Sequence, residues 1–234
     1  MATSRVTHLF ETDLGPQSVD VRRDRRARRL TLRVEPRDAA VVITVPPWTS
    51  TAEVEAMVRS RAAWIRARLA DMGPSIPFAP GNSVPVHGVD RLMVHEDSLR
   101  GSVQLESESL IVPGRPEHFA RRVRDWLKAE AKRVIEPKAD ETADQAGLKR
   151  GRISVRDTKT RWGSCSSDGR LSFSWRLIMA PTYVLDYVVA HEVAHLQEPN
   201  HSKRFWAVVE NLTPHRATAD EWLSKNGQRL QRYG

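Results

Sequence analysis

Residues 184–206 read VLDYVVAHEVAHLQEPNHSKRFW, and this stretch decides the fold of the C-terminal half of the chain. His191, Glu192 and His195 form an H-E-x-x-H pattern. On a helix, residues four apart lie on one face a turn apart, so the two imidazoles can share one metal ion. Val188 belongs to the same stripe, which predicts that the imidazoles continue an apolar face covered by protein.

A third histidine, His201, follows His195 by six residues. In a continuing helix it would project about 240° away from His195, on the far side. Pro199 predicts that the helix stops, because its ring disfavours helical geometry at the preceding residue and it lacks an N–H. Asn200 suits a turn, so the chain can double back and bring His201 to the same ion. Three neutral imidazoles plus one water are the expected coordination of a catalytic zinc, and a single cysteine, Cys165, excludes a Cys-rich structural site.

Glu192 is the candidate catalytic base. A hydrolytic site of this type needs a Lewis acid, a water molecule and a base. Zinc lowers the pKa of a water that it binds towards about 7, and Glu192 is placed to take the proton and pass it to the leaving group. A donor for the transition-state oxyanion is harder to assign. His215 is favoured over Tyr183, Tyr187 and Arg176, although a lone histidine is more often structural.

Several motifs together resemble the YgjP-like predicted zinc metallopeptidases, also described as predicted metal-dependent hydrolases. They are RWGSCS at 161–166, WRL at 175–177, Pro181, the H-E-x-x-H pattern with His201, and Phe205-Trp206. Stretches at 32–34, 45–46 and 64–65 look like the same family, so the resemblance spans most of the chain. It implies a zincin-type catalytic domain, distantly similar to the SprT-like proteases that act on proteins bound to DNA. Metzincins carry Gly at the position of Glu198, and no Met-turn is found, so the chain is not placed among them.

Arg161, Trp162, Gly163 and Ser164 look like the strand that rims the cleft of zincin-type folds and binds an extended substrate. Gly163 would let another backbone come close. The alternative is a structural strand with Trp162 in the core. Cys165 as a nucleophile is conceivable, but an isolated buried cysteine is the commoner case.

The composition is that of a globular protein. The chain has 234 residues, of which 40% are hydrophobic, so it can bury a sizeable core. Its apolar runs fall far below the roughly 20 residues of a membrane span. The N-terminus carries no apolar signal core, and one cysteine cannot make a disulfide framework. We therefore expect no membrane contact and a cytoplasmic location.

Basic charge is concentrated between residues 22 and 33. The formal net charge of +8 suggests an anionic partner or substrate without identifying it. Asp24 alone opposes seven arginines in this run, which are Arg22, Arg23, Arg25, Arg26, Arg28, Arg29 and Arg33. A nucleic-acid-binding arm is one interpretation. We favour a solvated edge strand with arginines on its open side, since no aromatic residue interleaves the run.

The pattern of apolar and turn residues predicts an α+β fold. Residues 1–114 are expected to form a β-rich region with one helix, and residues 115–234 a zincin-like catalytic domain with a small antiparallel sheet and the H-E-x-x-H helix. In the first region we expect an antiparallel pair at 30–34 and 41–45, a helix capped by Ser50 and Glu53 that runs to about residue 70, and a loop at 71–81. Short strands follow at 84–87, 92–95, 103–105 and 110–112.

In the second region, a long helix should start near Pro116, be kinked or broken at Pro137 and close at Gly147. A strand begins at Ile153, and segments 161–165 and 171–175 should pair as a hairpin around Asp168-Gly169. Two further helices follow the third histidine. No internal repeat is found in the sequence.

Three classes of function are compatible with these features. The first and preferred one is a zinc metallopeptidase that cleaves polypeptides. The second is a metal-dependent hydrolase of a small anionic substrate such as a nucleotide, of pyrophosphatase or phosphohydrolase type, which the basic excess supports. A cluster of carboxylates for a second metal is missing near the histidines, which weakens it. The third is a binding module with a vestigial zinc site.

Overall fold

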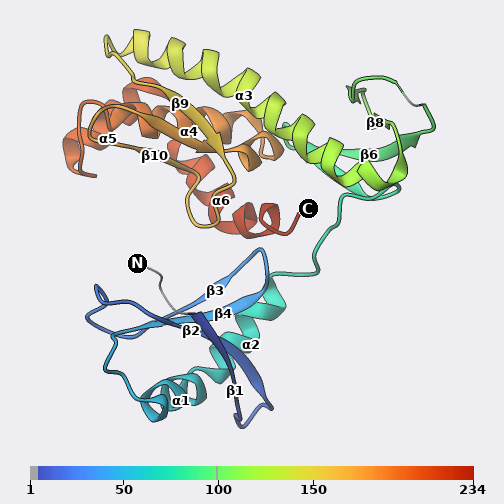
Figure 1. The fold of residues 1–234 in the computed structure, drawn as a ribbon. Coiled ribbons are helices and arrows are strands. Elements are labelled where there is room, and N and C mark those ends of the chain that lie inside the picture. Colours follow the sequence, from blue (N-terminus) through green and yellow to red (C-terminus); the bar gives the residue numbers. More distant parts are fainter. Residues whose placement is uncertain (1–4, 99) are drawn as a thin grey trace. The chain divides into compact units, whose positions relative to one another are not determined.

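A computed structural model of the protein describes residues 5–98 and 100–234. The chain forms two compact units, Met1–Ser75 and Ile76–Gly234, each with its own hydrophobic core. Both units combine helices with small sheets, so the α+β class predicted from the sequence is confirmed (Figure 1). The candidate metal ligands all lie in the second unit.

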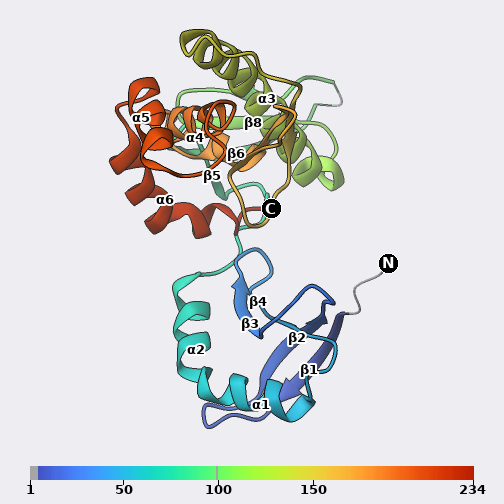
Figure 2. The same cartoon turned by 90° about the vertical axis from the view of Figure 1, so that its left-hand side faces the viewer.

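The first unit is a four-stranded sheet covered by two helices. Its strands are β1 (Arg5–Phe10), β2 (Gln17–Arg23), β3 (Thr31–Glu35) and β4 (Ala40–Val45), in the order β1-β2-β4-β3. The predicted antiparallel pairing of β3 with β4 is confirmed. The sequence predicts no strand at the positions of β1 and β2. Helices α1 (Thr51–Ser60) and α2 (Ala62–Asp71) lie on one face of the sheet (Figure 2).

The capping box at the start of α1 is present as predicted. The Ser50 hydroxyl accepts a hydrogen bond from the Glu53 backbone N–H at 3.2 Å, and the Glu53 carboxylate accepts one from the Ser50 N–H at 2.7 Å. The expected single helix is instead two helices, because Arg61 leaves helical geometry with φ −111° and ψ 7°. The break lets Val58 and Ile65 both join the core of this unit.

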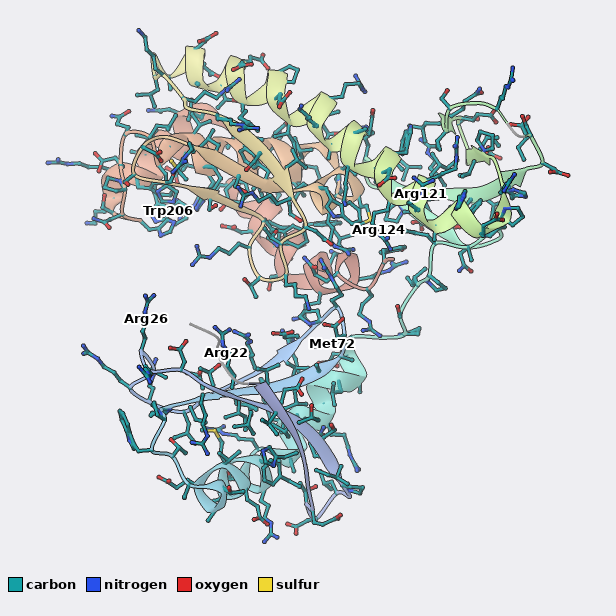
Figure 3. The ribbon with its side chains drawn as sticks, viewed as in Figure 1. Arg22, Arg26, Met72, Arg121, Arg124 and Trp206 are labelled. Carbon is teal, nitrogen blue, oxygen red and sulfur yellow. The ribbon has the colours of Figure 1, made fainter. Side chains whose placement is uncertain are left out.

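The seven arginines of the basic run occupy three different settings. Arg22 and Arg23 lie on β2, which has neighbours on both sides, and Arg33 lies on the edge strand β3. The other four are exposed in the loop between these strands, where Figure 3 shows Arg26 extending away from the ribbon. The edge-strand interpretation therefore fits Arg33 alone, because most of the run forms a loop.

The second unit begins with a sheet that repeats the strand arrangement of the first. Its strands are β5 (Ser83–Val86), β6 (Val89–Glu96), β7 (Gln104–Leu105) and β8 (Ser109–Pro113), in the order β5-β6-β8-β7. In both sheets two antiparallel hairpins are joined by a parallel central pair. The short strands predicted here are confirmed. The shared arrangement is not visible in the sequence because the loop lengths differ.

This sheet packs with the helices that follow it, so the observed boundary between the units differs from the predicted one at residue 114. Val84, Met93 and Leu110 belong to the same buried cluster as Phe119 and Leu127 of the following helix. A sequence boundary placed by the change from strands to helices misses such contacts, because they join segments that are far apart in the chain.

Helix α3 (Phe119–Gln145) spans the second unit after a short 3-10 turn at Pro116–His118. Pro137 does not break it, although a proline removes one backbone hydrogen bond. Gly147, with φ +67°, follows the C-terminus as predicted. The buried face of α3 packs against helix α4 (Thr182–Ala194).

The sheet beside α4 has three strands, β9 (Ile153–Arg156), β10 (Gly163–Cys165) and β11 (Leu171–Ser174), in the order β10-β11-β9. The predicted hairpin of β10 and β11 is confirmed, and Gly169 in its turn has φ +75°. The sheet is mixed rather than antiparallel as expected, because β9 pairs parallel to β11. After a 3-10 turn (Trp175–Met179) and α4, helices α5 (Lys203–Leu212) and α6 (Arg216–Leu230) complete the chain. Among the described residues no helix is long and apolar enough to cross a lipid bilayer.

Arg176 is a buried cation that fastens the C-terminal segment to the core. Its side chain is 1% exposed, and its guanidinium donates hydrogen bonds to the carbonyl oxygens of Leu230 at 2.9 Å and Tyr233 at 2.7 Å. The carboxylate of Asp157 lies 3.4 Å from its Nε atom. These contacts give Arg176 a structural role and keep it away from the candidate site.

Replacing Arg176 with methionine should lower the free energy of unfolding by roughly 3 kcal/mol, since two buried carbonyls lose their charged donor. Urea unfolding followed by tryptophan fluorescence measures this change. Arg121→Met on the exposed face of α3, where the arginine lies 3.5 Å from Asp125, is the matched control and should change stability by about 0.5 kcal/mol or less. Equal effects of the two substitutions would contradict the structural role of Arg176.

Candidate metal centre and active-site cleft

The three predicted ligands meet at one point. One nitrogen from each of His191, His195 and His201 lies within 4.8 Å of the other two. The Nε2 atoms of His191 and His201 are 3.0 Å apart. Two nitrogens bonded to one tetrahedral zinc at about 2.0–2.1 Å would be about 3.3 Å apart. The donor set and its spacing therefore fit a zinc ion held by three imidazoles.

The chain reverses after His195 in the way that the sequence predicts. Helix α4 ends at Ala194, and the last backbone hydrogen bond of this turn joins the Glu198 N–H to the Ala194 carbonyl at 3.0 Å. Pro199 cannot extend the ladder. The Ser202 N–H then bonds the Asn200 carbonyl at 2.7 Å, and Ser202 caps α5. His201 is thereby held in a tight turn below the end of α4.

Two aromatic side chains at the start of α5 fix the imidazole rings. Phe205, which is fully buried, stacks on His195 with ring centroids 4.4 Å apart and meets His191 and His201 edge-on at 4.9 and 4.7 Å. Trp206 stacks on His201 at 5.6 Å. In the sequence these aromatics appear only as part of the resemblance and of an apolar helical pattern, so their role as a support for the ligands was not predicted.

The surroundings of His191 and His195 favour the neutral imidazole that a metal ligand must be. Burial, together with the neighbouring imidazoles of His195 and His201, lowers the pKa of His191 to about 4. Burial also lowers the pKa of His195. The Nδ1 atom of His195 donates to the Glu198 carbonyl at 3.1 Å, since a carbonyl can only accept. This bond leaves the Nε2 lone pair of His195 free for the metal.

Glu192 is almost completely buried beside the histidines, with 6% of its surface exposed. Burial raises the pKa of its carboxyl group to about 7, and the nearby Arg161 guanidinium opposes the shift. A carboxylate with a pKa near neutrality is suited to accept and return a proton. The environment of Glu192 therefore agrees with the predicted role of a base.

Gly163 on β10 is in direct contact with Glu192. A Cβ atom at residue 163 would lie 2.5 Å from both Cγ and Oε1 of Glu192, which is far closer than atoms can approach. The sequence suggests that this glycine makes room for a substrate backbone. In the structure the space above its Cα is filled by the carboxylate itself. Strand β10 also lies at the edge of its sheet, with β11 as its one neighbour among the described strands.

The histidines and Glu192 open into two connected cavities. The larger one, of about 550 Å³, is lined by all three histidines, Glu192 and the residues 163–167 of β10 and its turn. The smaller one, of about 250 Å³, is lined largely by apolar side chains, among them Trp162, Val188 and Leu223. Both cavities include Gly163 and Glu192, so an elongated ligand can pass over β10 and occupy both.

The predicted substrate residues lie around this cleft, whereas the predicted donor does not. Arg161, Gly163 and Ser164 line the larger cavity, and Trp162 lines the smaller one. His215 packs against Tyr183 at 5.8 Å, which is two turns and about 12 Å before His191 along α4. The structure therefore does not bring His215 to the histidine cluster. Its position at the start of α6 could not be predicted from the sequence.

Two other side chains considered from the sequence line the cavities. The ring of Tyr187 lies 5.9 Å from that of His191 in the smaller one, and Cys165 lines the larger one. The Tyr187 hydroxyl is hydrogen-bonded to Asp220 and buried, and these surroundings raise its pKa. Burial raises the pKa of the Cys165 thiol, and Glu192 and Asp168 raise it further. The thiol therefore stays protonated, which does not favour Cys165 as a nucleophile.

Comparisons with known proteins point to one family. The sequence model of the family described as YgjP-like, metallopeptidase domain, matches residues 28–226. No curated protein matches the chain. Among solved structures, the metallopeptidase zymogen abylysin of Pyrococcus abyssi is similar over 39% of this chain and 94% of its own, with 25% sequence identity and a TM-score of 0.36.

The purified protein should bind about one zinc ion per chain, and His201→Ala should lose it as readily as His191→Ala. Each substitution removes one of three ligands. Elemental analysis after dialysis against a weak chelator measures the retained metal. His215→Ala is the matched control and should retain zinc. Full occupancy in His201→Ala would show that another residue supplies the third ligand.

Gly163→Ala should lower the rate of polypeptide hydrolysis by roughly 10²-fold or more. The added methyl group displaces the Glu192 carboxylate from its position beside the three histidines. The zinc content should not change, since residue 163 contributes no ligand. Steady-state kinetics and metal analysis of the same preparation provide both measurements. Normal turnover in this variant would mean that the contact between Gly163 and Glu192 has no part in the reaction.

Proposed function

Because the chain belongs to the YgjP-like metallopeptidase family, we propose that it is a zinc-dependent peptidase with His191, His195 and His201 as ligands and Glu192 as its base. The observation that carries this proposal is the contact of Glu192 with Gly163. It places a buried carboxylate between three convergent imidazoles and an unpaired strand edge. A peptidase needs these three parts in one place.

A zinc ion bound by the three histidines supplies a Lewis acid that makes water more acidic and polarises a peptide carbonyl. The protein's own contribution is to hold the three imidazoles in place before the metal arrives. Burial keeps the His191 ring uncharged, and Phe205 packs against all three rings. Little reorganisation is then needed on metal binding.

Glu192 transfers the proton during hydrolysis. Its carboxylate accepts a proton from the attacking water and delivers it to the amine that leaves when the peptide bond breaks. Burial, which raises the pKa of this group to about 7, makes both steps accessible at neutral pH. Arg161 lies close enough to stabilise the ionised form of Glu192, so the two charges balance each other in the cleft.

Strand β10 positions the substrate. Its free edge offers backbone N–H and C=O groups to an extended polypeptide, which is the usual way in which a sheet binds a peptide as an added strand. Side chains of such a strand alternate between its two faces. The mainly apolar cavity beside Trp162, Val188 and Leu223 can accept one of them, and its 250 Å³ suits a medium-sized or large hydrophobic residue.

A second candidate function is the hydrolysis of a small anionic substrate such as a nucleotide. The observation that favours it is a cavity lined by arginines next to the metal cleft. Phosphoryl transfer commonly uses a second metal held by carboxylates. In the described part of the chain the one cluster that could hold a metal is the histidine cluster. We therefore place peptide hydrolysis first.

Glu192→Gln should retain zinc and lose roughly 10²- to 10⁴-fold in turnover of an unstructured polypeptide, because the amide cannot accept a proton. Wild-type cleavage should stop when zinc is removed by a chelator and return when zinc is restored. Cleavage products are followed by mass spectrometry.

The same preparations are incubated with nucleoside triphosphates. Chelator-sensitive turnover of nucleotides without any cleavage of polypeptides would contradict the peptidase assignment and favour the second candidate.

A further inference from the structure

The outer face of the three-stranded sheet carries a row of polar residues that faces away from the core. Ser164 on β10 pairs with Ser172 on β11, and Ser172 pairs with Ser154 on β9. Directly paired residues lie on the same face of a sheet. The intervening residues, such as Leu171 and Phe173, are buried on the opposite face. The three serines thus cross the whole outer surface of the sheet.

Arginines surround this row. Arg152 and Arg156 flank Ser154 at a spacing of two residues, and Arg170 stands in the same relation to Ser172. Together with Arg161 they line a cavity of about 710 Å³ that has no acidic residue in its wall. All four arginine side chains are in exposed positions.

Two of the four arginines, Arg152 and Arg156, have no carboxylate partner among the described residues. Arg170 pairs with Asp168 at 2.8 Å, and Arg156 donates to the Ser154 hydroxyl at 3.2 Å. Arg161 faces the Glu192 carboxylate in the metal cleft and opposes the burial that raises its pKa. Exposed arginines without anionic neighbours, set among serine hydroxyls, are the donor set that carboxylates and phosphates bind.

The arginine-lined cavity is continuous with the metal cleft. Arg161, Ser164, Cys165 and Ser166 line both cavities. A polypeptide added to the outer edge of β10 lies about 14 Å from β9, a distance that an extended chain covers in about four residues. A polypeptide that pairs with β10 can therefore place its neighbouring residues among the arginines.

From this arrangement we propose that the outer face of β9–β11 is an anion subsite that selects polypeptides with acidic side chains near the cleaved bond. This inference rests on the proposed peptidase function. The backbone positions of Arg152 and Arg156 are about 13 Å apart, so the subsite suits several charges spread along an extended chain rather than one compact group. No aromatic side chain lines the cavity to stack a base, which disfavours single-stranded nucleic acid as its occupant.

The test measures binding separately from cleavage. A fluorescein-labelled peptide of alternating Glu and Thr, and its counterpart of alternating Gln and Thr, are titrated with zinc-loaded Glu192→Gln protein and followed by fluorescence anisotropy. The acidic peptide should bind at least tenfold more tightly, and salt should weaken its binding because the charges are exposed. The double substitution R152Q/R156Q should remove most of this preference.

A matched double substitution controls for the loss of two charges. R121Q/R124Q removes two arginines from α3, away from the cleft (Figure 3), and should change the affinity by less than twofold. A competition experiment uses the protein that keeps all its arginines. Its result therefore does not depend on whether the arginine variants fold correctly. Polyglutamate should displace the labelled peptide, and polyglutamine should not.

Equal binding of the two peptides, or an unchanged preference in R152Q/R156Q, would overturn the subsite. Displacement by a nucleoside triphosphate or an oligonucleotide at lower concentrations than polyglutamate would overturn the assignment of an acidic polypeptide. The anion subsite and the peptidase function can each fail without the other. If the acidic peptide binds through these arginines and the wild-type enzyme cleaves no peptide, the subsite stands and the peptidase proposal does not.

Discussion

The close contact between Gly163 on β10 and Glu192 on α4 is the constraint on which the rest of the site depends. It joins the strand that borders the cleft to the helix that carries two of the metal ligands, and it leaves no room for any side chain at residue 163. Because the carboxylate is held by packing, its distance from the histidines does not depend on a flexible loop. The same contact fixes where a polypeptide on the edge of β10 lies relative to the metal.

The remaining elements of the second unit support this contact. Helix α3 packs on α4 and shields the apolar face of α4 from water. Phe205 of α5 packs against all three imidazoles. The C-terminal segment is fastened to the core by Arg176. The half-buried imidazoles of His191 and His195 and the buried carboxylate of Glu192 cost free energy of desolvation. The rigid packing around them offsets this cost.

The sequence predicts the features of the site that depend on local spacing. The four-residue separation of His191 and His195, the end of the helix before Pro199 and the capping box at Ser50 follow from helix and turn geometry within a few residues. The structure agrees with each, although α4 already ends at Ala194. Features that depend on pairing between distant segments were missed. Strand β2 was missed because only two apolar residues, Val19 and Val21, mark its buried face. The boundary between the units depends on contacts of β5–β8 with α3. The arginine-lined face appears only when the register of β9 and β11 is known.

A crystal structure of the Glu192→Gln protein with zinc and a polypeptide substrate would show the metal and the bound strand together. We expect zinc bonded to His191, His195 and His201, and the polypeptide hydrogen-bonded as an added strand along the free edge of β10. Zinc held by a different set of residues, or a polypeptide bound away from β10, would contradict this expectation.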